Sequence, residues 1–337
     1  MASSNLVSVG YSTATAKAIA DLVVGRYEIP GLTTCTLLNR GFNDTYLVRT
    51  NSGVRFVLRV SGHRTRGPAD VEAETAFLAY LESSGVPVAA PLPTRDGRLF
   101  TMACLPEGIR PVVLFKYVEG RTPNPDARED ARVQGKTLAR VHQAADEFPA
   151  RESGSRRLDL DQLLHRQVAA VLELELDAPQ ARSDLLSLAA RLADSVGNVD
   201  QMLTRTRCHG DCHGLNARIA TSGPLTGQAI FFDFADGGYG YVSYDLAVHL
   251  WAQVSFGRRR HGMWHAFHEG YRSVRSVTPG DEAAVPIFVA IRHIWLMGEY
   301  ATRVDEWGSE NLPSEWLKNH VAFLLAWEGD KLLPAFL

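Results

Sequence analysis

His209–Asn216, with the sequence HGDCHGLN, is followed further along the chain by Ile230–Asp236, with the sequence IFFDFAD. The first stretch places a carboxylate, Asp211, five residues before an amide, Asn216, and the second places another carboxylate, Asp233, at the end of a strand-like run. Between them, LNARIA and AIFFDF predict a hairpin around a Ser-Gly-Pro turn, which can return Asn216 and Asp233 to one point. The alternative is a pair of unrelated turns with capping Asp and Asn side chains.

These three side chains suit phosphoryl transfer from ATP to a hydroxyl group. In such a reaction the protein orients the acceptor hydroxyl, takes its proton and holds Mg²⁺ on the phosphates. Asp211 would accept the hydroxyl proton, and Asn216 and Asp233 offer the hard oxygen ligands that Mg²⁺ prefers. The pattern therefore predicts an enzyme, an ATP- and Mg²⁺-dependent O-phosphotransferase.

Outward from this motif, the chain changes character about one third of the way along. Residues 35–117 alternate strand-like runs with turns, among them one at Asp96-Gly97. One helix is expected from Pro68 to Ser84, with Gly85 as its cap. From residue 126 onward, amphipathic helical stretches dominate. We expect a bilobal α+β fold: a small antiparallel β lobe with one key helix (1–117), a linker (118–125) and a larger, mainly helical lobe (126–337).

Composition excludes several classes of protein. The 337 residues carry 35 basic and 38 acidic side chains, a formal charge of -3, so a nucleic-acid partner is not expected. The longest apolar run, Val285–Met297, is interrupted by Arg292 and His293 and is too short to span a membrane. The N-terminus lacks the pattern of a signal peptide, and four cysteines suit a reducing compartment. We expect a cytoplasmic protein.

The motifs resemble a known superfamily. HGDCHGLN and FDFAD followed by YDLA are similar to the catalytic and metal-binding segments of the aminoglycoside phosphotransferase and choline kinase-like superfamily, which has a protein-kinase-like fold. FVLRV, VPVAAP and the C-terminal EWLKNHVAFLLAWEGDKLLP also have counterparts there, and within the superfamily the chain resembles stress response kinase A. The resemblance implies that Asp211 is the catalytic aspartate, that Asn216 and Asp233 bind Mg²⁺, and that His209 braces the loop. It also implies that Asp245 begins a helix as a structural N-cap.

The resemblance further implies a cation on the third strand that contacts the nucleotide phosphates, and a helix glutamate that holds this cation. The position of the usual lysine is occupied by Arg59, which strand alternation places on the opposite face from Leu58. Helix geometry selects Glu74 as the partner, because Glu74 lies in the apolar stripe whereas Glu72 falls on the far side. A purely structural ion pair is the alternative to phosphate binding.

Two further segments are expected to contact the nucleotide. Arg40, Gly41 and Asn43 lie in a strand-turn-strand segment whose backbone N–H groups could approach the phosphates, although an ordinary hairpin turn is the alternative. The resemblance places the adenine pocket beneath the LFKY segment, which contains Phe115 and Tyr117. The turn has one glycine instead of three and an arginine replaces the lysine, so a nucleotide-binding regulator without turnover is a further alternative.

The acceptor hydroxyl is less constrained. Similarity to stress response kinase A favours a Ser or Thr hydroxyl on a protein or peptide, and a small-molecule antibiotic or metabolite is the alternative. A further alternative is a kinase of a biosynthetic pathway that phosphorylates Ser or Thr of a peptide, so that a partner enzyme, a lyase, can eliminate the phosphate. The region after Asp245 is basic at Gly257–His261 where a polycationic aminoglycoside would need acidic residues, which argues against that substrate. Trp295 and Trp307 are candidates to line an acceptor cleft.

Two other groups of residues are candidates to bind ions. Asp236 is close enough in sequence to Asp233 to contact a second ion, with a turn-capping role as the alternative. Half of a zinc site is suggested by Cys208, His209, Cys212 and His213, but no second Cys/His cluster follows at the spacing that a zinc site requires. Zinc binding is therefore not expected.

Overall fold

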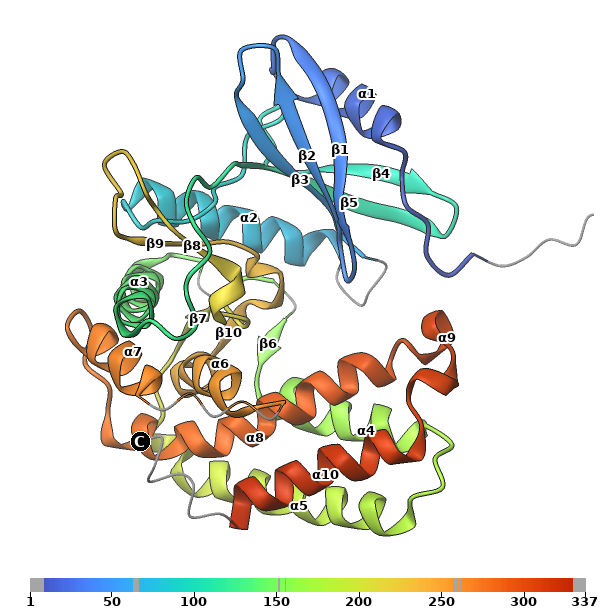
Figure 1. Cartoon of the computed structure of the whole chain (residues 1–337), viewed down its shortest axis with the longest axis vertical. Coiled ribbons are helices and arrows are strands. Elements are labelled where there is room, and N and C mark those ends of the chain that lie inside the picture. The colour runs from blue at the N-terminus through green and yellow to red at the C-terminus, as the bar shows by residue number, and fades with distance from the viewer. Residues whose placement is uncertain are drawn as a thin grey trace, which may run out of the picture. The chain divides into compact units, whose positions relative to one another are not determined.

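The computed structural model describes residues 9–62, 67–150, 152–154, 156–256, 258, 260 and 262–329. The chain packs as two compact units: the first holds the chain up to Ala79 together with Ala89–Tyr117, and the second holds Tyr80–Val88 and the chain from Val118 onward. The first unit contains an antiparallel sheet and the second is mainly helical (Figure 1). The expected α+β fold class is confirmed.

A five-stranded sheet of order β1-β2-β3-β5-β4 forms the first unit, and every neighbouring pair is antiparallel. Helix α1 (Ala16–Arg26), which the sequence analysis did not predict, buries Ile19 and Val23 against one face, beside Leu58 of the sheet. Arg59 therefore points to the opposite face, as strand alternation requires. The strands are β1 (Leu32–Arg40), β2 (Asp44–Thr50), β3 (Arg55–Val60), β4 (Thr101–Leu105) and β5 (Gly108–Lys116).

The turn residues were predicted with mixed success. Helix α2 (Pro68–Ser83) ends as expected, because Gly85 adopts a φ of 73° that favours glycine and lets the chain leave the helix. The expectation that strands meet at the Asp96-Gly97 turn is wrong. That turn lies in an irregular segment before β4, and the chain turns between β4 and β5 after Leu105. An Asp-Gly pair indicates a turn but does not specify that the turn joins two paired strands.

The second unit is a helical assembly around α8 (Figure 1). Helix α8 packs against α4 and α6, and α3 packs against α7. None of the described helices is both long and apolar enough to cross a membrane. Residues 330–334 of the C-terminal resemblance lie outside the described residues. The helices are α3 (Arg128–Glu147), α4 (Arg166–Glu173), α5 (Pro179–Val199), α6 (Val242–Val254), α7 (Met263–Arg272), α8 (Pro279–Ala301), α9 (Val304–Trp307) and α10 (Ser314–Gly329).

Short strands in this unit hold the two motif segments. The predicted hairpin is present as β8 (Ala217–Ile219) and β9 (Ala229–Phe231), with Ala217 opposite Phe231. A three-stranded sheet that the sequence analysis did not predict joins β6 (Arg157–Leu158), β10 (Gly238–Tyr241) and β7 (Arg205–Cys208). Strand β7 leads into the first motif segment and β10 follows the second, so this sheet fixes where the first segment begins and where the second ends.

Candidate active site

The backbone of the loop after β7, which carries Asp211, forms hydrogen bonds with Asp245. The two carboxylate oxygens of Asp245 accept hydrogen bonds from the backbone N–H groups of His209 (2.6 Å) and Gly210 (2.7 Å). The prediction that Asp245 is an N-cap is wrong, since α6 begins at Val242 and Asp245 lies inside its first turn. Its carboxylate satisfies the N–H groups of the loop instead of those of its own helix.

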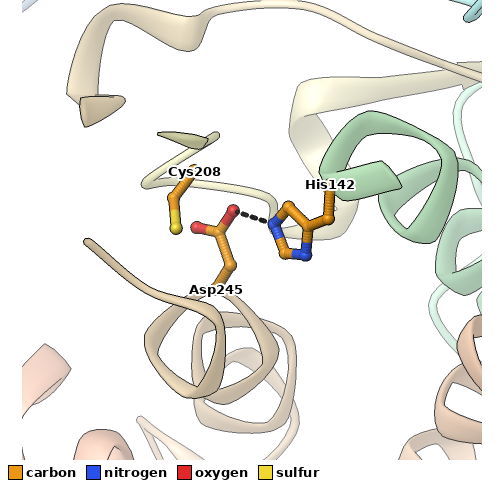
Figure 2. Close-up of side chains that lie close together, drawn as sticks. All are labelled: His142, Cys208 and Asp245. Carbon is orange, nitrogen blue, oxygen red and sulfur yellow. Dashed lines mark hydrogen bonds and ion pairs between the residues drawn. The ribbon is translucent and has the colours of Figure 1, made fainter. Parts of the chain in front are cut away.

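Figure 2 shows a second contact of Asp245, in which its Oδ2 lies 3.0 Å from His142 Nε2, beside Cys208. The other ring nitrogen of His142 lies 2.8 Å from the hydroxyl of Tyr271. Cys208 donates its S–H to the Tyr241 carbonyl (3.4 Å), and burial raises the pKa of its thiol. His142, Cys208 and Asp245 thus each have a hydrogen-bond partner within the protein, so the cluster gives no reason to assign a metal.

His209 joins the two motif segments. The backbone N–H of Asp211 donates to His209 Nδ1 (3.2 Å), so the neutral ring carries its proton on Nε2, which donates to the Phe232 carbonyl (3.2 Å). Burial lowers the pKa of His209 and keeps the ring neutral even though Asp211 and Asp233 attract a proton to it. These contacts are those of a brace between the loop and the strand that precedes Asp233.

Asn216 and Asp233, the expected ligands of Mg²⁺, come from the two strands of the β8–β9 hairpin region. The side-chain N–H₂ of Asn216 donates to the Oδ2 of Asp211 (2.8 Å) and to its backbone carbonyl (2.9 Å), which leaves Oδ1 as a potential ligand atom. The Phe232 N–H donates to the Asn216 carbonyl (3.1 Å), so Asp233 lies one residue beyond the position opposite Asn216. Asp233 has a left-handed backbone with a φ of 62°, which is uncommon outside glycine and concentrates at functional sites. This donor set fits Mg²⁺, whose binding stays a prediction.

Arg292 of α8 is a residue of this site that the sequence analysis missed. Its guanidinium donates to the Oδ1 of Asp211 and, at 3.3 Å each, to the Gly210 carbonyl and the Tyr244 hydroxyl. Burial acts to raise the pKa of Asp211, but the charge of Arg292, with His213, holds that pKa below its ordinary value. The signal in the sequence was a charged residue inside an apolar run, which indicates a buried partner.

In the first unit, Arg59 and Glu74 form a two-bond ion pair with distances of 2.8 and 2.6 Å. Their exposed fractions are 5% and 6%, whereas Glu72 is exposed, as the helix geometry indicates. The guanidinium carbon of Arg59 also lies 5.2 Å from the centre of the Phe115 ring. The Tyr117 ring is contacted in the same way by Arg55 of β3 (4.1 Å). Nucleotide binding by these residues stays a prediction.

The segment from Arg40 to Asn43 has the geometry of a hairpin turn. Arg40 pairs with Asp44 across it, and the Gly41 N–H donates to the Asn43 carbonyl (3.3 Å). The side-chain oxygen of Asn43 accepts the backbone N–H of Gly62 (3.0 Å), which ties the turn to the end of β3. The geometry is therefore that of the alternative interpretation, and phosphate contact by Arg40, Gly41 and Asn43 stays a prediction.

Three other expected features have these outcomes. Asp236 forms an ion pair with Arg156 (3.8 Å), and its contact with a second ion stays a prediction. The Cys212 thiol donates to the Asp245 carbonyl (3.0 Å). Of the predicted basic cluster, Gly257, Arg259 and His261 lie outside the described residues, and Arg260 is paired with Asp126 at 3.1 Å.

A pocket of about 610 Å³ lies among α8, α9 and α10, within the size range of small-molecule sites. Of the two predicted cleft tryptophans, Trp307 lines this pocket, whereas Trp295 is buried with Arg292 at 4.3 Å over its ring. Leu296, another lining residue, is four residues after Arg292, so the pocket begins about 6 Å further along the axis of α8. Most of the remaining lining is apolar or aromatic: Phe256, Met297, Tyr300, Leu312 and Trp316.

Comparison with other sequences places this geometry in a family. Residues 34–277 match the model of the family described as "Phosphotransferase enzyme family". An uncharacterized protein of Deinococcus radiodurans is 37% identical over 323 residues, which cover 94% of this chain and 91% of that protein. A homoserine kinase of Caulobacter vibrioides is 27% identical over 274 residues, which cover 79% of this chain and 80% of that enzyme.

Solved structures show the same fold. A microcompartment-associated aminopropanol kinase matches with a TM-score of 0.69 and 24% identity, over 92% of this chain and 95% of that one. Amicoumacin kinase in complex with AMP-PNP, Ca²⁺ and Ami matches with a TM-score of 0.69 and 18% identity, over 93% of this chain and 92% of that one. These names give no support to the expected protein or peptide acceptor. The chain belongs to the phosphotransferase enzyme family.

Proposed function

We propose that this protein is a kinase that transfers the γ-phosphoryl group of ATP, with Mg²⁺, to a hydroxyl group of a small molecule. The observation that carries the proposal is the arrangement of Asp211, Asn216 and Asp233, in which an oriented carboxylate lies beside two oxygen donors suited to Mg²⁺. A small-molecule acceptor is favoured by the names of the relatives, a homoserine kinase, an aminopropanol kinase and amicoumacin kinase.

In this mechanism Asp211 orients the acceptor hydroxyl and receives its proton as the new O–P bond forms. Asn216 holds one carboxylate oxygen and Arg292 holds the other, so the group is fixed before the acceptor binds. The low pKa of Asp211 keeps it ionised, and a weak base is sufficient in a loose transition state, in which the hydroxyl keeps its proton until late. Bound Mg²⁺, with Asn216 and Asp233 as ligands, would neutralise the charge of the phosphates.

The first unit supplies the residues proposed to bind the nucleotide. Arg59 retains the positive charge of the lysine that it replaces, and its bidentate contact with Glu74 fixes the guanidinium in one position. A guanidinium carries five N–H donors in a fixed planar fork, a geometry that suits phosphate oxygens. We propose that Arg59 contacts the phosphates in this way.

The test measures ADP release by the full-length protein with ATP and Mg²⁺. One acceptor panel contains small alcohols, including homoserine, aminopropanol, choline and an antibiotic, and a second contains Ser and Thr peptides. We expect turnover with a small alcohol, and we expect Asp211→Asn to lower it about 10²- to 10⁴-fold while calorimetry shows ATP affinity largely intact. Phosphorylation of peptides alone would contradict the small-molecule acceptor, and full turnover in Asp211→Asn would contradict the role of Asp211. Tight ATP binding with no product on either panel would favour the regulator.

A further inference from the structure

The pocket among α8, α9 and α10 is lined by His320, and hydrogen bonds from Trp251 and His293 determine which of its ring nitrogens carries the proton. The indole N–H of Trp251 donates to His293 Nδ1 (3.1 Å). His293 Nε2 lies 2.8 Å from the Nδ1 of His320, which lines the pocket. The three residues come from α6, α8 and α10, so packing of these helices creates a continuous chain of hydrogen bonds that ends at the pocket.

The chain permits one arrangement of protons. An indole nitrogen can only donate, so His293 Nδ1 has to be the acceptor and His293 carries its proton on Nε2. That proton is donated to His320 Nδ1, and the proton of His320 is therefore on its own Nε2. Neither ring can be doubly protonated while these bonds persist. Burial acts in the same direction and lowers the pKa of His320, and that of His293 to about 3.

His320 Nε2–H is therefore a donor with a fixed proton, and the described residues form no hydrogen bond with it. The described residues that line the pocket include no carboxylate and no cation. The guanidinium of Arg303, which lies 5.4 Å from the centre of the Trp307 ring, is ion-paired with Glu306 at 3.8 Å. An ammonium group placed in the pocket would have no counter-charge among the lining residues, whereas an oxygen atom would find a donor.

The pocket is also connected to Asp211. Arg292, which donates to Asp211, lies with its guanidinium 5.1 Å from the centre of the Trp251 ring, and Trp251 begins the chain of bonds that ends at His320. Leu296 lies one helical turn beyond Arg292 on the same face of α8 and lines the pocket. Arg292 and Trp251 therefore link the pocket to the carboxylate that is proposed to orient the acceptor hydroxyl.

We propose that this pocket holds an uncharged, largely apolar part of the phosphate acceptor, and that His320 determines specificity by donating its Nε2–H to an oxygen atom of that part. This inference rests on the proposed function and deepens it. The site discriminates in favour of an oxygen with a lone pair and against a protonated amine at the same position, because a protonated amine has no lone pair to accept the bond.

The first test is independent of catalysis. Nitrogen-15 NMR of histidine-labelled full-length protein reports which ring nitrogen carries the proton. We expect His293 and His320 both to be neutral with the proton on Nε2 at neutral pH. In Trp251→Phe, which removes the initial donor, we expect the other tautomer of both rings to become populated. A proton on His320 Nδ1, or a doubly protonated ring, in the unaltered protein would overturn the inference.

The second test uses two matched probes, benzyl alcohol and benzylamine, which differ in presenting a neutral hydroxyl or an ammonium group on the same ring. Binding is followed by the NMR shifts of residues that line the pocket. We expect benzyl alcohol to bind more tightly, and Leu296→Trp, which fills the pocket, to abolish binding of both probes. His320→Phe should reduce the affinity for benzyl alcohol about three- to tenfold, the effect of one hydrogen bond, and His320→Gln should restore part of it.

The matched control is His265→Phe, since His265 is exposed and lies in α7, which packs against α3 and α6. It should leave both affinities unchanged. Tighter binding of benzylamine, or a preference that survives in His320→Phe, would overturn the inference even if the protein is an active kinase. Absence of turnover on all acceptors, with the expected tautomers and probe preference, would instead refute the proposed function and leave the pocket chemistry standing.

Discussion

Replacing Arg292 with methionine is expected to raise the pKa of Asp211. The unaltered side chain donates to Asp211 Oδ1 and holds the pKa of that carboxyl below its ordinary value, against the effect of burial. Methionine keeps much of the volume of the arginine stem and removes the charge. With the cation gone, burial becomes the dominant influence on Asp211 and favours its neutral form.

The size of the effect follows from the contacts. Two unit charges about 4 Å apart interact by about 4 kcal/mol at an effective dielectric constant near 20, which sets an upper value for the stabilisation of the ionised carboxylate that is lost with Arg292. Solvent reduces this, because 16% of the Asp211 side chain is exposed. His213, 3.3 Å away, and the amide of Asn216 remain to favour the ionised form. The lost stabilisation of the ionised carboxylate should therefore be well below this upper value.

The sign determines the pH window. A carboxyl whose pKa is depressed in the folded protein contributes its full stability above its unfolded-state pKa, and this contribution is lost as the pH falls through the depressed value. Arg292→Met should lack this contribution, and at a higher pH its Asp211 should lose the ionised form that can accept a proton. Carbon-13 NMR titration of the aspartate carboxyls, with Asp211 assigned by its absence in Asp211→Asn, measures the pKa directly, and the acid limb of the rate profile should move with it. Arg292→Lys, which retains a charge, is the control. A pKa for Asp211 that stays below its ordinary value in Arg292→Met would refute this reasoning.

Three further changes test other parts of the structure by urea unfolding. Arg59→Met should lower the free energy of unfolding by about 3–5 kcal/mol because Glu74 is left buried without its partner, and adding Glu74→Leu should recover much of the loss; equal losses in the single and double variants would contradict a buried pair. Asp245→Ala should cost about 3–5 kcal/mol, since two buried backbone N–H groups lose their acceptor, with a smaller cost for Asp245→Asn. Gly135→Ala should destabilise by about 1–3 kcal/mol because its Cβ would meet a carbonyl of α7, whereas Gly197→Ala, which meets nothing within 4 Å, should stabilise by about 0.5–1 kcal/mol.

Local patterns in the sequence predicted the sheet-forming strands, helix α2 with its Gly85 cap, and the β8–β9 hairpin. Each of these depends on neighbours within a few residues, so the information is present in a short window. Strand β7 and strand β10 were missed because each is four residues long and is stabilised mainly by pairing with the other. Helix α1 was missed although its N-cap, Thr15, accepts the Ala18 N–H in the expected way.

The sequence by itself determined the family motifs, the α+β class and the identity of the three side chains proposed to manage phosphoryl transfer, because motif spacing and a single hairpin bring those residues together. Only the tertiary structure decided what surrounds them. Arg292 meets Asp211 across 81 residues of chain, and Trp251, His293 and His320 form one chain of hydrogen bonds from three helices. Such contacts depend on how buried helix faces pack, and periodicity predicts which residues are buried without specifying which partner each one meets.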